Sequence, residues 1–353
     1  MKKALLVIGD RKASKFKSAR PFTTFVKHIK KEAKTNFIEL KILSYKDVLS
    51  NNIPAFMGRV ITVISFFPFD YWNKYIEVYD KDNRIYGDAK FGRDYKNFLE
   101  NVEGKLKEAY KGKKIEYFNS PSSSLLERDK KRSKRLFQKK GILVPRVFRV
   151  RNVKDIRRLI NAEKSIYIKP RFGAMGKGIT YLSKDSFLTN FVYRKGKIVN
   201  RKSDFGWRFH SINEKDREKF LKRLVLKDFI FEEAIEHPVY NGRRFDFRVH
   251  VVFQKTPYFY VKSMPTIAPI SNWTQGGRIE KKENFSKFVS HRNIKKIKSL
   301  AMKATEALNL SYAAVDILMS KDLKKVYCLE AHTFPGHEKR FGIMQYIAKQ
   351  IIK

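Results

Sequence analysis

Short apolar runs alternate with longer amphipathic segments along the first third of the chain. The period of the apolar positions predicts strands in four places and helices in two, namely strands at 4–8, 37–43, 60–66 and 114–118 and helices at 22–34 and 95–110. Strands that alternate with helices are typical of a parallel sheet covered by helices. We therefore predict an N-terminal α/β domain over residues 1–118.

The pattern changes at a polar turn. Residues 119–124 contain four serines and are followed by the first apolar side chain at Leu125, and serine is a favoured helix N-cap. We place a domain boundary here. Beyond it we predict helices at 123–140, 213–226 and 293–308, a loop at 263–277, and strands at 146–150, 165–170, 178–182, 190–193, 197–201, 229–235, 246–253, 258–261, 313–319 and 325–332.

The net charge of the chain indicates which kinds of partner it can bind. Lys and Arg number 77 and Asp and Glu 35, which leaves a net charge of +42. Such a charge excludes a chain built to bind basic partners and favours anionic substrates. Cys328 is the only cysteine, so intrachain disulfides and thiolate zinc cages are excluded and we expect a cytoplasmic location. Since no apolar run approaches the roughly 20 residues of a membrane span, we expect no membrane partner.

A glycine-rich turn follows Lys169 at the end of a predicted strand. Gly173, Gly176 and Gly178 stand in this turn, and glycines let backbone N–H groups approach phosphate oxygens. The spacing fits neither a Walker A loop nor a G-x-G-x-x-G dinucleotide loop. From these residues alone, a phosphate site and a plain glycine-rich hairpin with a surface lysine both remain open.

Three polar residues stand out in the last two predicted strands. Asp316 lies inside an apolar run, where an ionised carboxylate needs a cation or strong hydrogen bonds. Glu330 and His332 are two positions apart, about 7 Å along a strand, so both point to one face. The three residues predict either a metal site or strand-end salt bridges. Cys328 and His332 would be about 13 Å apart, too far to share a zinc ion, even with His337 as a further ligand.

Taken in order, these motifs and several others resemble the ATP-grasp superfamily, and within it the carboxylate–amine ligases similar to glutathione synthetase and the ribosomal-protein glutamate ligases. The resemblance covers residues 119–336 and rests on Asn119-Ser120-Pro121, Arg128-Asp129-Lys130, the Lys169-Pro170 strand with its glycine turn, Phe231-Glu232-Glu233, Asp246-Phe247-Arg248, Asn272-Trp273-Thr274-Gln275-Gly276-Gly277, Val315-Asp316-Ile317 and Glu330-Ala331-His332. Residues 191–201 also resemble a hairpin inserted in the spore-coat-associated ATP-grasp proteins of bacilli.

The resemblance implies a fold and a set of roles. It implies that residues 119–353 form an ATP-grasp fold of two α+β lobes, a first lobe at 119–230 that carries the inserted hairpin and a second at 231–353. The implied roles are phosphate contact for Lys130 and Lys169, adenine binding for Glu233 and the backbone of Ala234, ribose contact for Asp246, acyl-phosphate contact for Arg248, contact with the transferred phosphate for Asn272, and Mg²⁺ or Mn²⁺ binding for Asp316, Glu330 and His332.

Two positions depart from the family pattern. His332 stands where the family usually has asparagine, and imidazole is a less natural ligand for Mg²⁺ than an amide oxygen. Ile270 stands where the glutamate ligases often have arginine, although Lys262 upstream keeps a cation near this point. These departures bear on metal preference and phosphate handling.

The sequence thus predicts an ATP-dependent ligase that joins a carboxylate to an amine through an acyl phosphate, with ATP and an acidic small molecule or peptide as its partners. An ATP-grasp kinase acting on an anionic molecule, and a nucleotide- or nucleic-acid-binding protein with a degenerate ATP site, are the alternatives. The basic run at 130–135 could contact nucleic acid, but a solvated helix face is the favoured interpretation.

Overall fold

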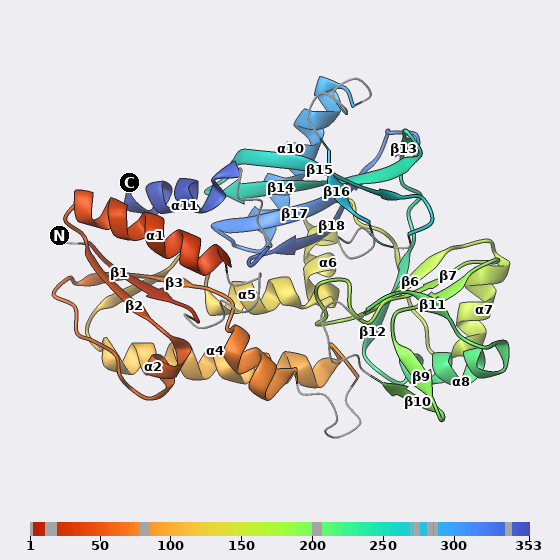
Figure 1. The fold of residues 1–353 in the computed structure, drawn as a ribbon, viewed down its shortest axis with the longest axis horizontal. Helices are drawn as coiled ribbons and strands as arrows, with labels where there is room; N and C mark the ends of the chain where they lie inside the picture. Colours follow the sequence, from red (N-terminus) through yellow and green to blue (C-terminus); the bar gives the residue numbers. More distant parts are fainter. Residues whose placement is uncertain are drawn as a thin grey trace.

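The fold is described from a computed structural model, for residues 3–10, 20–77, 85–199, 207–268, 270, 276–280, 285, 289–335 and 341–353. The described strands form four sheets. In Figure 1 the three larger ones lie near the two chain ends, below helix α10, and near helices α7 and α8. Helices α5 and α6 lie between them. None of the helices in the described part of the chain is both long and apolar enough to cross a membrane.

The N-terminal sheet is parallel, as predicted, with strand order β2-β1-β3-β4. Its strands are β1 (Lys3–Ile8), β2 (Glu39–Leu43), β3 (Val60–Ser65) and β4 (Lys114–Tyr117). The helices of this region are α1 (Arg20–Thr35), α2 (Tyr45–Leu49), α3 (Phe69–Tyr71), the π-helix η3 (Trp72–Ile76), α4 (Ala89–Ala109) and the C-terminal helix α11 (Ile343–Ile352).

Helices cover both faces of this sheet (Figure 1). Leu6 of β1 joins the hydrophobic core that includes Phe98 of α4. The neighbouring Val7 joins the core that includes Phe25 of α1 and Ile347 of α11. A strand buried on both faces must be apolar throughout, which explains the continuous apolar run at the start of the chain. The C-terminal helix thus packs against the N-terminal sheet. The predicted division into domains at 1–118 and 119–353 stays a prediction.

Two helices, α5 (Pro121–Arg128) and α6 (Lys130–Lys139), connect this sheet to the rest of the chain. The single helix predicted at 123–140 is therefore wrong. Asp129 interrupts it with non-helical backbone angles, φ −83° and ψ 87°, and its carboxylate accepts hydrogen bonds from the backbone N–H groups of Lys131 and Arg132, both at 3.2 Å. The same carboxylate accepts from Arg171 Nε at 2.6 Å. Asp129 is thus the N-cap of α6, which fixes the direction of that helix.

The first antiparallel sheet has the strand order β11-β8-β7-β6-β12-β5. Its strands are β5 (Val147–Phe148), β6 (Ile166–Pro170), β7 (Thr180–Leu182), β8 (Phe187–Thr189), β11 (His210–Ser211) and β12 (Phe229–Glu233), and its helices are α7 (Val153–Asn161) and α8 (Glu214–Val225). The predicted hairpin is confirmed as β9 (Val192–Arg194) and β10 (Lys197–Val199). Its turn residues Lys195 and Gly196 both have positive φ, as a type I′ hairpin turn requires.

The second antiparallel sheet has the order β16-β15-β14-β17-β18, with β13 paired to β14. Its strands are β13 (Val239–Tyr240), β14 (Arg243–Val252), β15 (Lys255–Pro265), β16 (Arg278–Ile279), β17 (Tyr312–Met319) and β18 (Val326–His332), and it carries α10 (His291–Ala307). Strand β15 runs to Pro265, so the loop predicted from residue 263 begins too early. The apolar face of this sheet packs against α10 in one core.

Candidate active site

Charged side chains gather on the face of the second sheet that points away from α10. Strand register places them side by side: Asp246 lies opposite Lys262, and Arg248 lies opposite Asp316. Asp316 in turn lies opposite Glu330 on β18. Because side chains two positions apart share a strand face, Asp246 and Arg248 point the same way. Four adjacent strands therefore contribute to one polar surface.

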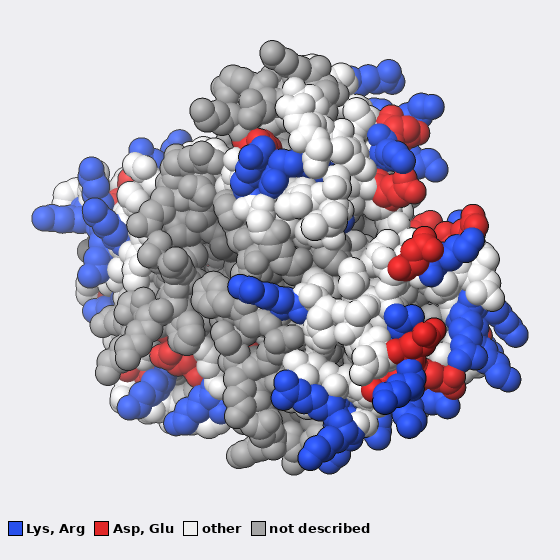
Figure 2. Space-filling view, turned by 45° about the vertical axis from the view of Figure 1, so that its right-hand side comes forward, with Lys and Arg blue, Asp and Glu red and all other residues white. Residues whose placement is uncertain are grey.

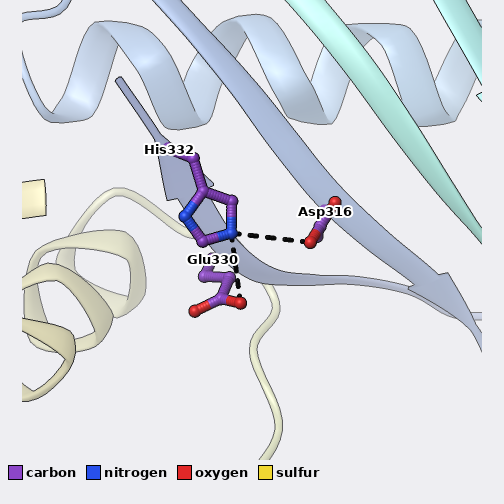
Figure 3. Close-up of side chains that lie close together, drawn as sticks. All are labelled: Asp316, Glu330 and His332. Carbon is purple, nitrogen blue, oxygen red and sulfur yellow. Dashed lines mark ion pairs between the residues drawn. The ribbon is translucent and has the colours of Figure 1, made fainter. Parts of the chain in front are cut away.

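Asp316, Glu330 and His332 form a compact cluster on this surface (Figure 3). One ligand atom from each residue lies within 4.8 Å of the others. Nε2 of His332 is 3.1 Å from Oε1 of Glu330 and 3.5 Å from Oδ2 of Asp316. Nδ1 of His332 is 3.6 Å from Oε1 of Glu127 on α5. The structure thus brings together the three residues for which the sequence predicts metal binding.

A β-bulge in β18 produces this arrangement. Asp316 pairs with Glu330, but the next residue of β17, Ile317, pairs with Cys328, so one residue of β18 is skipped. In a regular strand Cys328 would share a face with Glu330. The bulge instead places Cys328 in the hydrophobic core with Ala331, fully buried. Strand periodicity alone therefore assigns Cys328 to the wrong face.

Two cations flank Asp316. Arg248 donates from Nε and Nη2 to the two carboxylate oxygens at 2.7 and 2.8 Å, and Lys262 Nζ is 3.1 Å from Oδ1. Burial alone would raise the pKa of the Asp316 carboxyl, but Arg248 and Lys262 together hold this pKa well below its usual range. Lys262 also lies 3.0 Å from Asp246. The predicted contact of Asp246 with the ribose stays a prediction.

The imidazole of His332 is held in the charged form by its neighbours. Burial works to lower the pKa of His332, but Glu330, Asp316 and Glu127 outweigh it and raise this pKa to about 10. Burial likewise works to raise the pKa of Glu330, whereas His332 and Lys130 hold it well below its usual range. The cluster is therefore an array of ionised groups in which neighbouring cations balance the charges of the carboxylates.

A second buried cluster lies where α6 packs against β12. Glu232 is 1% exposed, and its two carboxylate oxygens each meet a lysine: Lys169 at 2.8 Å and Lys134 at 2.9 Å. Lys134 is 4% exposed and also donates to the carbonyl of Leu329, at 3.1 Å. The expected solvated face for the run 130–135 is therefore wrong at Lys134, because one turn of α6 faces the interior.

Lys130 joins the two clusters. Its Nζ donates to the carbonyl of Gly173 in the glycine-rich turn and lies 3.3 Å from Oε2 of Glu330. Lys130 and Lys134 are four positions apart, so they share one face of α6. This helix face thus contacts the glycine turn, the Lys169–Glu232 pair and the cluster of Asp316.

The glycine turn is anchored at several points. Gly176 and Gly178 have φ values of 69° and 72°, which other residues rarely adopt. Asn190 Nδ2 donates to the carbonyl of Gly176 at 2.7 Å, and the N–H of Ala174 donates to the hydroxyl of Tyr86 at 3.1 Å. The turn is therefore held to the first sheet and, through Tyr86, to the N-terminal part of the chain.

Three predicted residues lie apart from these contacts. The N–H of Glu233 donates to the carbonyl of Arg146 at 2.8 Å, and that of Ala234 to the carbonyl of Ser165 at 2.9 Å. Both N–H groups are thus engaged within the protein, and an adenine contact at this segment stays a prediction. Asn272 lies outside the described residues, as does His337.

Sequence reasoning missed Lys134, Glu232 and Glu127. A usable signal existed for Lys134, because its spacing of four from Lys130 places both on one helix face. Glu232 follows three apolar residues and is next to Glu233, and the pattern does not say which of the two is buried. Glu127 has no local signal, because only the packing of α5 beside β18 brings it to His332.

Basic side chains are spread over the surface. On the face in Figure 2, Lys and Arg side chains lie along the right-hand, lower and left-hand margins and also near the centre, with Asp and Glu among them. Glu218, for example, meets Lys222 at 3.0 Å and also Arg157. Such exposed pairs contribute little to stability. The coloured side chains on this face do not form a single basic patch.

Residues 129–353 match the family described as YheC/D like ATP-grasp. The match spans more than half of the chain and includes both clusters. The chain belongs to this ATP-grasp family. The resemblance predicted from the sequence motifs is thereby confirmed, and so is the predicted fold class.

Relatives and solved structures of this ATP-grasp chain agree with that assignment. Over 173 residues it is 33% identical to the tetrahydromethanopterin:alpha-L-glutamate ligase of Methanocaldococcus jannaschii, covering 48% of this chain and 45% of that protein. The chain thus spans less than half the length of this relative. Two solved structures share its fold: the ATP-grasp ligase PsnB, with a TM-score of 0.58, 14% identity and coverage of 100% and 99%, and D-alanine–D-alanine ligase from Bacillus anthracis, with a TM-score of 0.55, 15% identity and coverage of 100% and 96%.

Proposed function

We propose that this ATP-grasp chain is an ATP-dependent ligase that activates a carboxylate as an acyl phosphate and joins it to an amine. One observation carries the proposal: Lys130 links the glycine turn to Glu330 of the acidic cluster, so the proposed phosphate site and the proposed cation site would adjoin. A nucleotide with its phosphates on the lysines would place its terminal phosphate beside Asp316 and Glu330. That arrangement suits phosphoryl transfer.

The lysines of the two clusters supply the positive charge that phosphate binding needs. Lys130 and Lys169 have side chains 15% and 19% exposed, so both can reach a ligand from a largely buried position. Burial alone would lower the pKa of Lys169, but Glu232 raises it above its ordinary value, so the lysine stays charged. Charged groups fixed in a low-dielectric site stabilise developing negative charge without costly reorganisation.

The cluster of Asp316, Glu330 and His332 fits a divalent cation. Two carboxylates and one imidazole within 4.8 Å form a donor set that suits Mg²⁺ or Mn²⁺. Asp316 and Glu330 would hold the ion, with His332 as a third ligand. When bound, the ion would neutralise charge on the phosphate oxygens of ATP.

The proposed reaction has two steps. A carboxylate oxygen of the substrate attacks the γ-phosphorus of ATP, the bond to the β-phosphate oxygen breaks, and ADP leaves. The nitrogen of a neutral amine then attacks the acyl carbon, inorganic phosphate leaves, and the nitrogen loses one proton. In this scheme Arg248 and Lys262 face the acyl phosphate and neutralise its charge, in line with their position beside Asp316.

The curated relative supports this reaction class, because its name is that of a glutamate ligase. The carboxylate substrate we propose is an acidic small molecule or peptide. The net charge of +42 favours anions through long-range attraction.

Trapping with hydroxylamine tests the proposal. The full chain is incubated with ATP, Mg²⁺, hydroxylamine and single carboxylates, beginning with L-glutamate and short glutamyl peptides. Hydroxylamine replaces the amine, so an acyl phosphate yields a hydroxamate together with equal amounts of ADP and free phosphate. The Asp316→Asn variant should lose the product, whereas Glu306→Gln, which removes an exposed charge from α10, should keep it.

Other outcomes separate the alternatives. A stable phosphorylated product without free phosphate would replace the ligase with a kinase. Absence of ATP binding in calorimetric titration would identify a degenerate nucleotide site.

A further inference from the structure

A pocket that opens to solvent lies at the carboxyl ends of β1 and β3, on the side of the N-terminal sheet that faces α1 and α11. Its walls are mostly apolar and include the aromatic rings of Phe22, Phe66, Phe67 and Phe118. The nucleotide and metal residues discussed above do not line it, so the pocket is available for another ligand.

Among the described residues that line the pocket, Asp10 is the only acidic one, and its surroundings are unusual. The residue is 6% exposed, and its Oδ2 accepts a hydrogen bond from the backbone N–H of Asp70 at 2.9 Å. Within the described part of the chain no Lys or Arg side chain pairs with Asp10. Burial raises the pKa of Asp10 to about 6. A buried carboxylate without a counter-ion is costly, and a cation from a ligand would remove that cost.

The pocket adjoins the acidic cluster through the end of β18. His332 is the last residue of this strand, and the next residue, Thr333, lines the pocket. Thr333 Oγ1 donates to Oε2 of Glu127 at 3.4 Å, and the other oxygen of Glu127 faces His332. Phe334, one residue further, is also part of the wall. A ligand in the pocket would therefore lie next to the proposed site of acyl transfer.

We propose that this pocket binds a substrate that carries an ammonium group on an aromatic or other apolar body, with Asp10 as the counter-ion. Aromatic walls favour the binding of such a ligand for two reasons. They bury its apolar part, and their π-faces attract its cation. An anionic ligand would be repelled by Asp10, although the chain as a whole attracts anions. The assignment of the ligand as a substrate rests on the proposed ligase function.

Calorimetric titration with three small probes tests the inference on the full chain without ATP. The probes are 2-phenylethylamine, 2-phenylethanol and 3-phenylpropionate, which share one apolar body and differ in charge. We expect the amine to bind at least about tenfold more tightly than the alcohol, which is the size of effect that a charged hydrogen bond produces, and the carboxylate to bind most weakly. Equal affinity for amine and alcohol, tightest binding of the carboxylate, or no binding of the amine would overturn the inference.

Two variants locate the effect. Asp10→Asn should reduce the preference for the amine to less than about threefold, whereas Glu100→Gln, which removes an exposed carboxylate from α4, should keep the preference. Unchanged preference in Asp10→Asn would overturn the role of Asp10, and if that variant does not fold, the probe series on the unmodified chain decides. ATP turnover is measured separately. Selective binding of the amine without ATP turnover would support the inference about the pocket and contradict the proposed ligase function. ATP turnover without selective binding of the amine would contradict only the inference about the pocket.

Discussion

Arg248 and Asp316 lie directly opposite each other on β14 and β17, and two guanidinium nitrogens meet the two carboxylate oxygens at 2.7 and 2.8 Å. A bidentate pair of this kind fixes both side chains in position. One oxygen of Asp316 also faces His332, and the other faces Lys262. Asp316 is therefore the point at which the acidic cluster meets the cations of the sheet.

Neutralising a carboxylate of this cluster should abolish turnover. We expect Asp316→Asn and Glu330→Gln each to lower hydroxamate formation by at least about 100-fold, because a bound cation would lose a charged ligand. Treatment with EDTA should have the same effect, and added Mg²⁺ should restore activity only in the unmodified chain. Glu306→Gln is the matched control. An Asp316→Asn variant with more than a tenth of the normal rate would contradict the assignment.

His332 should influence which metal ion the site prefers. In His332→Asn an amide oxygen replaces the imidazole nitrogen, and amide oxygens suit Mg²⁺ better. We expect activity to stay within about tenfold and the ratio of rates with Mg²⁺ and Mn²⁺ to rise. Parallel assays with each ion measure this ratio. A variant that is inactive with both ions would assign His332 a role other than metal preference.

Lys169 should contribute to nucleotide binding. In Lys169→Ala, Glu232 loses one cation but keeps its contact with Lys134, so we expect the variant to fold with reduced stability. We expect the affinity for a non-hydrolysable ATP analogue to fall by at least about tenfold, since a charge-assisted contact with a phosphate is lost. Calorimetric titration measures the affinity, and Lys164→Ala, at an exposed lysine just before β6, is the control. Unchanged affinity would remove Lys169 from the nucleotide site.

Lys134 should contribute mainly to stability. Lys134→Met leaves the buried carboxylate of Glu232 with one cation fewer, and we expect the free energy of unfolding to fall by about 3 kcal/mol. Adding Glu232→Gln should restore at least half of this loss. Lys131→Met, at the 43% exposed neighbour that pairs with Asp228, should cost less than about 1 kcal/mol. Chemical denaturation measures all three variants, and equal costs at Lys134 and Lys131 would contradict the buried pair.

Asp10 should make stability depend on pH. Its pKa is raised to about 6 by burial and by the charge of Asp70, so the folded chain holds this proton more tightly than the unfolded chain. The protonated carboxyl therefore stabilises the folded chain. This contribution to the free energy of unfolding is fully present below the ordinary pKa of an aspartate and is lost as the pH rises through about 6. Besides Asp70, the phenol of Tyr45 lies near this carboxylate.

Asp10→Asn removes this titration. Between pH 5 and pH 8 we expect the variant to gain about 1 to 2 kcal/mol in free energy of unfolding relative to the unmodified chain, after allowance for solvent screening. Denaturation at several pH values gives the difference, and Glu100→Gln should show no such trend. A gain that is the same at pH 5 and pH 8 would show that Asp10 does not titrate in this range.

Much of the architecture follows from local pattern. The apolar run at the start of the chain predicts a strand buried on both faces, and β1 is such a strand. The hairpin turn at Lys195 and Gly196 is equally local. The helix predicted at 123–140 fails at Asp129, because the contact that favours the break comes from Arg171 in a distant segment.

The sequence by itself determined the identity of the residues in the acidic cluster, since Asp316 stands out in an apolar strand and Glu330 and His332 share a spacing of two. Only the tertiary structure decided how these residues meet. The register of β17 against β18 and the bulge beside Cys328 place one side chain in the core and its neighbours on the polar face. The partners of Glu232 and the pocket at Asp10 also depend on contacts between segments that are far apart in the chain. Local residue spacing does not encode such contacts, because the packing of the folded chain brings these segments together.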